Sequence, residues 1–209
     1  ARARVRIGAT RLAVADGNMR LAEFAWDDGR ITTSGSYTGV PLASVARFTG
    51  TPLPFRSTVT LGGEWSLAAA PRLTGSLAIR REGGDVFFAR SATSDATIAA
   101  GITALEAVAR FTDDAIDATA SFRSTRGDRA DAKLVIGAVT GAPPGRPAAD
   151  APLDFSVTGD MPSLQLLQPW IGSAAVVSGR AHLDFTAHGT VGRAALEGTL
   201  KGEDLRIDA

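Results

Sequence analysis

Few residues in this chain of 209 residues could do chemistry: it has two histidines, His182 and His188, and no cysteine. The histidines are six residues apart in a segment that alternates like a β-strand. At about 3.3 Å per residue they are separated by roughly 20 Å, which is too far to share a metal ion. Both fall at polar positions, so we interpret them as surface side chains. We predict no catalytic residue, no metal site and no cofactor.

The other reactive groups form no recognisable site. Asp and Glu are scattered at polar strand positions or in turns, and no pair is placed for acid–base catalysis. The sequence strings of phosphate-binding loops, dinucleotide sites, serine hydrolases and zinc proteases do not occur. Arg126-Gly127-Asp128 spells a cell-adhesion tripeptide, but Gly-Asp between two strands is typical of a turn. We therefore predict a turn at these three residues. Because no recognisable catalytic site is found, we also predict that the protein is not an enzyme.

An enzymatic alternative stays open, for example one acting on carbohydrates. It requires two carboxylates roughly 5 to 10 Å apart in a cleft beside Trp26 or Trp65. The tryptophans, which include Trp170, are spaced too widely to stack successive bases of a single-stranded nucleic acid. With 22 basic and 22 acidic residues the chain has no net field to attract nucleic acid, and we predict no such partner.

The elements that position these residues are strands. Apolar and polar residues alternate over 116–123, 153–158, 182–188 and 196–201, and alternation with period two predicts a sheet with one apolar and one polar face. Very few helices are available to cover the apolar face. The fold class predicted is therefore all-β with one or two short helices.

Turn residues divide the chain into strands. Residues 4–37 read as three or four strands, with turns at 16–18, 28–29 and Ser34-Gly35. Further strands are predicted at 64–67, 73–80 and 85–90, and Gly83-Gly84 is predicted to be the turn between the last two. Residues 102–110 fit a helix or a strand, and the flanking strands favour a strand.

Two short helices and one connector complete the organisation. Pro41 opens a helical candidate near 41–48, and a second lies near 162–168. A connector rich in Pro, Gly and Ala at 141–150 separates a β segment at 1–140 from another at 151–209. Both ends alternate like strands of a continuing pattern, which predicts that the chain is a piece of a longer protein.

Three neighbouring stretches, 63–67 (GEWSL), 71–81 (PRLTGSLAIRR) and 84–86 (GDV), have the form G-x-W, P-x-L-x-G-x-L-x-x-x-R and G-D. A similar passage occurs in the TamB family of AsmA-like proteins, which the chain resembles over nearly its whole length. Near the end, 189–192 (GTVG) and 196–200 (LEGTL) resemble its recurring strand-and-turn phrase. Arg193-Ala194 departs from that phrase, which usually has a proline here.

This resemblance implies an elongated, curved β-sheet trough with an apolar interior, in an envelope-biogenesis protein that spans the periplasm. It implies an N-terminal inner-membrane anchor and an outer-membrane partner of the Omp85 type, neither recognisable in this sequence. The cargo implied is phospholipid acyl chains or unfolded outer-membrane β-strands. Burial is worth roughly 0.8 kcal/mol per CH₂, so an apolar trough could hold an acyl chain without polar contacts.

We predict that the trough is lined by large apolar residues at the apolar strand positions. A closed, non-enzymatic β-sandwich or β-solenoid with a structural or adhesive role explains the same residues and stays open as the alternative. The candidates are Leu77, Ile79, Val86, Phe88, Ile116, Phe122, Leu134, Ile136, Phe155, Leu183, Phe185, Leu196, Leu200 and Leu205.

Overall fold

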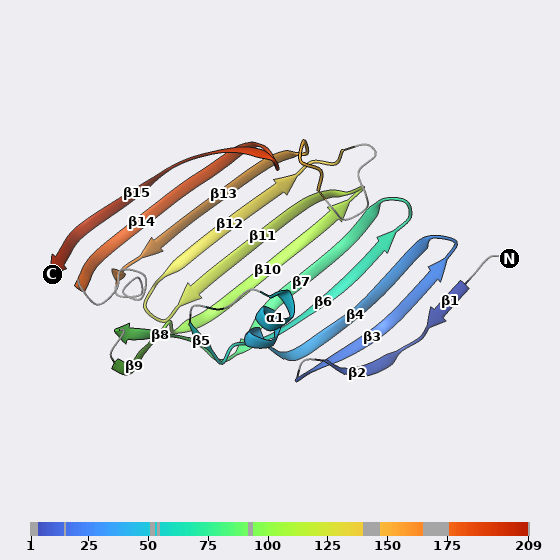
Figure 1. Ribbon diagram of the computed structural model, residues 1–209, viewed down its shortest axis with the longest axis horizontal. Helices are drawn as coiled ribbons and strands as arrows, with labels where there is room; N and C mark the ends of the chain where they lie inside the picture. Colours follow the sequence, from blue (N-terminus) through green and yellow to red (C-terminus); the bar gives the residue numbers. More distant parts are fainter. Residues whose placement is uncertain are drawn as a thin grey trace.

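The computed structural model describes residues 4–14, 16–50, 53, 55–91, 94–139, 147–164 and 176–208. Within them the chain forms one 12-stranded sheet, one 3-stranded sheet and a short helix, and every strand pair is antiparallel. The large sheet is not closed into a barrel, so the prediction of an all-β trough is confirmed. Figure 1 shows its strands side by side, with the two ends of the chain at opposite edges.

The large sheet follows the chain from one edge to the other, in the order β1-β3-β4-β6-β7-β10-β11-β12-β13-β14-β15, with β2 also paired to β3. Its strands are β1 (Arg4–Ile7), β2 (Thr10–Val14), β3 (Gly17–Asp27), β4 (Arg30–Pro41), β6 (Thr60–Ala69), β7 (Leu73–Gly83), β10 (Ile102–Thr112), β11 (Ala115–Ser124), β12 (Arg129–Ile136), β13 (Pro152–Met161), β14 (Val176–Thr190) and β15 (Arg193–Asp208).

Strand register aligns the apolar positions of all these strands on one side. Residues paired across antiparallel strands project to the same face. One row of such pairs runs Trp65, Leu77, Ala109, Ala118, Leu134, Phe155, Ala187 and Leu196. We call the side that carries this row the apolar face and the opposite side the polar face.

Bulges interrupt the register without exchanging the faces. The pairing of β3 with β4 shifts between Leu21 and Glu23, and that of β14 with β15 shifts between Ser178 and Arg180. In each case one strand contributes an extra residue, so the apolar positions on either side of the bulge stay on the same face. The apolar face is therefore continuous along the long strands.

Part of the apolar face is covered by the helix α1 (Leu42–Thr49) and by the small sheet, formed by β5 (Arg56–Ser57), β8 (Val86–Ser91) and β9 (Ser94–Ala99). The helix begins after Pro41, whose extended backbone leads in from β4, and ends at Gly50 in the left-handed conformation. Figure 1 shows α1 in front of the large sheet, near the lower ends of β6 and β7.

The short helix predicted near 41–48 and the strand predicted at 102–110 are confirmed by α1 and β10. The turn predicted at Ser34-Gly35 is wrong, because both residues lie inside β4. Gly35 is there for close packing: a Cβ at this position would lie 2.5 Å from the Trp65 ring of the neighbouring strand.

The prediction that Gly83-Gly84 forms the turn between two paired strands is also wrong. β7 and β8 do not pair with each other; β7 belongs to the large sheet and β8 to the small one. Gly84, with φ of +78°, lies against the carbonyl of Thr58 and redirects the chain over the apolar face. Residues 165–168 of the second helical candidate, and 141–146 of the predicted connector, lie outside the described residues.

Candidate functional site

The two faces of the large sheet differ almost completely in charge. Among the described side chains of its strands, every Asp, Glu, Lys and Arg projects from the polar face except Arg81, near the end of β7. The guanidinium of Arg81 donates hydrogen bonds to the carbonyl oxygens of Gly84 and Thr103, so its charge is directed at backbone. The apolar face is thus a continuous surface without free charge.

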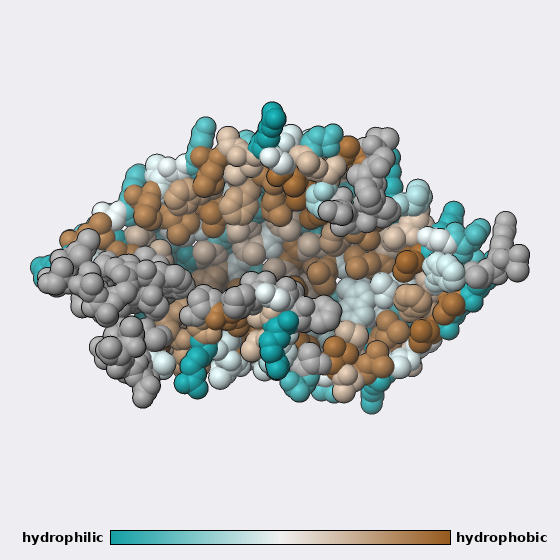
Figure 2. Space-filling model, in the orientation of Figure 1, coloured by the Kyte–Doolittle hydropathy of each residue, from teal (hydrophilic) through white to brown (hydrophobic). Residues whose placement is uncertain are grey.

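The middle of the apolar face is hollow because its side chains are small. Ala107 and Ala109 of β10 pair with Ala120 and Ala118 of β11, and Ala120 pairs with Ala132 of β12. These five residues are the alanine floor. A methyl group projects only a short distance from the backbone, so the floor lies below its surroundings. Figure 2 shows apolar side chains gathered around a hollowed middle of this face.

Larger apolar side chains form the walls of this hollow, whose volume is about 240 Å³. Leu77 and Ile79 stand on β7, and Leu134 and Phe155 stand on β12 and β13. Each of these four side chains is half-buried, so the hollow is open to solvent. We call the hollow and its walls the groove; the surface that lines it is almost entirely apolar.

One side of the groove is closed by a true hydrophobic core. A cluster joins the large sheet to the small sheet, and Leu42 of α1 packs against it. Its members, each at most 8% exposed, are Val59, Leu61, Val86, Phe88, Ala100 and Ile102. The rings of Phe55 and Phe88 meet edge to face at 5.7 Å. Tyr37 packs against the same cluster, and burial raises the pKa of its phenol.

We call α1 and the small sheet, which lie over part of the apolar face, the cover. Asp85 connects the cover to the large sheet. Its carboxylate accepts hydrogen bonds from the backbone N–H groups of Val86, Gly101 and Ile102, at 2.8, 2.9 and 3.2 Å. Val86 begins β8 and Ile102 begins β10, so one side chain holds the starts of two strands from different sheets. The covered part of the apolar face is thereby fixed in position.

Near both edges of the sheet the apolar face is exposed, whereas Ile136, Ala181 and Ala187, between the cover and β15, are each at most 8% exposed. On β15, Leu196, Leu200 and Leu205 are 67%, 65% and 55% exposed. At the other edge of the sheet, Val5 and Leu12 are 44% and 46% exposed. Exposed apolar area of this extent commonly marks a binding surface, because burying it is favourable.

The structure places all but two of the predicted lining residues on the apolar face of the large sheet. Leu77, Ile79, Leu134 and Phe155 border the hollow. The remaining ones on this face are Ile116, Phe122, Ile136, Leu183, Phe185, Leu196, Leu200 and Leu205.

Val86 and Phe88 do not line the groove, which corrects the prediction for these two positions. They belong to β8 of the small sheet and are 7% and 8% exposed within the hydrophobic core. Their alternating pattern is that of a lining strand. The difference arises because Gly84 turns the chain away from the large sheet, so their apolar side faces down onto the cover's own core.

The alanine floor is the part of the site that the sequence interpretation missed. Large residues were taken as the lining, whereas the depth of the groove depends on the small ones between them. A signal was present: Ala107, Ala109, Ala118, Ala120 and Ala132 occupy consecutive apolar positions on three neighbouring strands. Only the register shows that they are adjacent.

Both histidines lie on the polar face, as predicted, and each meets an aspartate. The Nδ1 atom of His182 is 2.8 Å from Asp160, and that of His188 is 2.7 Å from Asp154. The hydrogen bonds from His182 and from Arg129 hold the pKa of the Asp160 carboxyl below its ordinary value. These pairs are exposed and join neighbouring strands.

The turn predicted at Arg126-Gly127-Asp128 is confirmed. Asp128 is 2% exposed, and its carboxylate accepts a hydrogen bond from the Ser124 hydroxyl. The backbone N–H of Asp128 donates a hydrogen bond to the oxygen of the Ser124 hydroxyl. A carboxylate buried in this way closes the turn and is not presented to a partner.

Trp26 and Trp65 project from the apolar face, whereas Glu23 and Glu64 of the same strands project from the polar face. These carboxylates and tryptophans therefore do not share a surface. Trp170 lies outside the described residues. Within them, no group of three or more His, Asp and Glu side chains could hold a metal ion.

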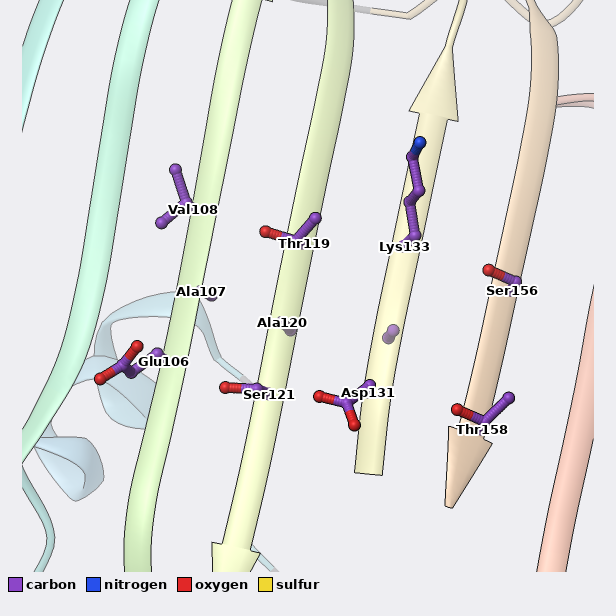
Figure 3. Close-up of a pocket in the computed structure, with 11 residues that line it drawn as sticks. Glu106, Ala107, Val108, Thr119, Ala120, Ser121, Asp131, Lys133, Ser156 and Thr158 are labelled. Carbon is purple, nitrogen blue, oxygen red and sulfur yellow. The ribbon is translucent and has the colours of Figure 1, made fainter. Parts of the chain in front are cut away.

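The polar face also has a hollow, of about 400 Å³, on the far side of the alanine floor. Figure 3 shows its side chains, among them Glu106, Thr119, Ser121, Asp131 and Lys133. Asp131 is engaged by both of its oxygens with Arg123, each at 2.9 Å. The side chains of this hollow can form hydrogen bonds with water or polar solutes. The groove on the opposite face of the same strands has an apolar lining.

No helix within the described residues has the length and apolar character needed to cross a membrane. Comparison of the chain with protein-family models, with curated proteins and with solved structures found no match. The geometry of the apolar face is therefore the basis on which a function is proposed.

Proposed function

We propose that this chain is a trough segment of a periplasmic, TamB-like envelope protein, and that its groove shelters or conducts phospholipid with the acyl chains against the apolar face. The observation that carries the proposal is the segregation of charge. An apolar face free of charges other than Arg81 extends across the large sheet, and only part of it is covered.

The energetics support an acyl chain as the occupant. Each buried CH₂ contributes roughly 0.8 kcal/mol, so a chain of many methylenes is held without a hydrogen bond or a charged contact. The side chains around the hollow supply only apolar atoms, from Leu77, Ile79, Leu134, Phe155 and the alanine floor. A lipid headgroup would remain in water above the open side.

The row of paired apolar residues extends beyond the groove, and this supports conduction as well as binding. The alanine floor spans β10, β11 and β12, and the apolar row continues through Phe155 and Ala187 to Leu196 at the edge strand. The path thus runs across the strands. A lipid moving along it would pass from one strand to the next without meeting a charged side chain.

The proposal includes the setting that the sequence resemblance implies. The complete protein would be anchored in the inner membrane and would work with an Omp85-type partner in the outer membrane. The occupant is phospholipid in this proposal, and an unfolded outer-membrane β-strand is the competing outcome of the test below.

The test is lipid retention by the purified chain after incubation with vesicles of phosphatidylethanolamine and phosphatidylglycerol. Native mass spectrometry should detect bound phospholipid on the wild type. Ala118→Phe places a ring in the hollow and should abolish most of the binding. Phe155→Asn should reduce it, because a polar side chain then borders the acyl chain.

Ser121→Phe is the matched control, because Ser121 lies on the same strand β11 but projects from the polar face and does not line the groove. It should bind as much lipid as the wild type. A wild type that takes up no lipid, or an Ala118→Phe variant that binds normally, contradicts the proposal. Retention of an alternating apolar peptide in place of lipid would assign the groove to protein clients instead.

A further inference from the structure

The groove differs at its two ends, and the end at β7 is closed. Its wall there consists of Leu77 and Ile79, which stand directly opposite Ala109 and Ala107 of the alanine floor. Ile79 also packs against the hydrophobic core, so the cover lies behind this wall. Side chains of the described residues, and not open solvent, therefore bound the groove at β7.

A second rank of large side chains stands behind the wall. Trp65 of β6 pairs with Leu77, and its ring lies over Gly35 of β4, where an added Cβ would be 2.5 Å from the ring. Tyr37 lies over Gly63 in the same way, and a Cβ there would be 2.7 Å from its hydroxyl. The two rings fill the space that the glycines leave, so the apolar rows have no opening toward β4.

Both rings are held in place by their surroundings. The indole Nε1 of Trp65 donates a hydrogen bond to the Thr33 hydroxyl at 3.1 Å, and Tyr37 packs against the hydrophobic core. A chain that continued past β7 would have to displace both ranks, and close-packed side chains do not yield such space cheaply. The β7 wall is therefore a stop.

The opposite end of the groove has one row that stays low. Its alanines run in register across β10, β11 and β12 and end at Ala132. The next residue of the row is the short side chain of Val157 on β13. Beyond it, the ring of Phe185 lies over Gly198 of β15, away from Val157. The groove thus has one closed end at β7 and one exit over β12 and β13.

The size of the hollow limits what it can hold. Its volume of about 240 Å³ is below the roughly 300–1,000 Å³ of pockets that enclose a drug-sized ligand. A phospholipid with two acyl chains is larger than such a ligand, so only a segment of one chain fits between the walls. The rest of the lipid lies beyond the exit, where the apolar face continues toward β15.

We infer that an acyl chain enters the groove over β13 with its methyl end first, and that the β7 wall stops this end and so measures the length of the chain. The inference rests on the proposed function, because it takes an acyl chain as the occupant. It adds an orientation and a length selectivity, neither of which binding to an apolar face requires. The headgroup lies on the side of β13 to β15.

The orientation is tested with phospholipids that carry a photoreactive diazirine on one acyl chain, either at the methyl end or near the carboxyl end. The wild-type chain is loaded with each probe and irradiated, and mass spectrometry of its peptides locates the cross-links. The methyl-end probe should react with β7 and β10, and the carboxyl-end probe with β13 and β14. The reverse assignment, or the same strands for both probes, would overturn the inference.

The length limit is tested with lysophospholipids of increasing acyl length, which compete with a fluorescent fatty acid for the groove. Affinity should rise by up to about fourfold for each CH₂ until the hollow is filled, and far less steeply beyond that length. Leu77→Ala removes part of the wall and should move this break in slope to chains longer by a few methylene groups. Ala109→Leu fills the floor in front of the wall and should move it to shorter chains.

Leu73→Ala is the matched control, because Leu73 lies on the same strand and the same face as Leu77 but does not line the groove. It should leave the break where the wild type has it, and urea unfolding shows that each variant is folded. A break that is missing, or that stays in place in both groove variants, would overturn the inference while lipid binding and the proposed function remain. A wild type that binds no lipid would contradict the proposed function and the inference together.

Discussion

The covered and open parts of the apolar face are built from the same alternating strands but have different physical roles. Where α1 and the small sheet cover the apolar face, Phe88 of the small sheet is 8% exposed and packs against Phe55. On the open part, Phe155 is half-buried and borders the hollow. The comparison shows that an alternating strand specifies an apolar face, while the cover decides whether that face becomes a core or a groove.

The largest expected difference between the two parts is in their contribution to stability. Phe88→Ala should lower the free energy of unfolding by about 3–5 kcal/mol, because it leaves a cavity in a packed core. Phe155→Ala should cost only about 1 kcal/mol, because its side chain is already partly solvated. Urea denaturation measures both, and equal losses would contradict the distinction.

The attachment of the cover gives the second prediction. Asp85→Ala removes the acceptor of three backbone N–H groups and should cost about 2–3 kcal/mol. Hydrogen exchange should accelerate at Val86 and Ile102 and remain slow in β12 and β13. Uniform acceleration throughout the large sheet would mean that the cover and the groove unfold as one unit.

Adding volume should have opposite consequences in the two parts. Ala100→Phe overfills a site that is 4% exposed and should lower the free energy of unfolding by about 1–3 kcal/mol. Ala118→Phe enters open space and should change it by less than about 0.5 kcal/mol. Thermal and urea unfolding of the two variants tests this. A large loss for Ala118→Phe would indicate that the hollow is filled by protein.

The smallest expected effect concerns the polar face and pH. The lowered pKa of Asp160 means that its charged form stabilises the folded state above the ordinary pKa of an aspartate. That contribution is lost as the pH falls through the lowered value. The melting temperature of Asp160→Asn should therefore lie slightly below that of the wild type at pH 7 and approach it at strongly acidic pH.

High salt should shrink this difference at pH 7, because the carboxylate is exposed and its interactions are screened. Asp184→Asn, on the same face and without an ion pair to the described residues, is the matched control. A difference for Asp160→Asn that is independent of both pH and salt would assign the effect to packing instead of charge.

Much of the fold could be predicted from the sequence because the alternation is regular. Period two shows which residues of a strand share a face, and it placed Leu134, Phe155 and Phe185 correctly on one side. It could not show what lies above that side. Val86 and Phe88 alternate in the same way, yet they lie in the cover because of the left-handed backbone at Gly84.

The groove itself was less predictable than the strands. Its depth depends on contacts between alanines that are distant in sequence, such as Ala109 with Ala118 and Ala120 with Ala132. Gly35 illustrates the same limit. Glycine usually signals a turn, but this one makes room for the Trp65 ring on the neighbouring strand, a requirement that appears only once β4 and β6 are paired.

The bulges have a consequence for how this protein tolerates changes in length. Removing one residue from the regular part of β11 would exchange the faces of every residue beyond it and would direct Asp117 or Arg123 into the groove. Removing Ala22 would only straighten the bulge between Leu21 and Glu23, since that residue has no partner on β4. Single-residue deletions should therefore be tolerated at the bulges, whereas the strands between them should accept changes only in steps of two.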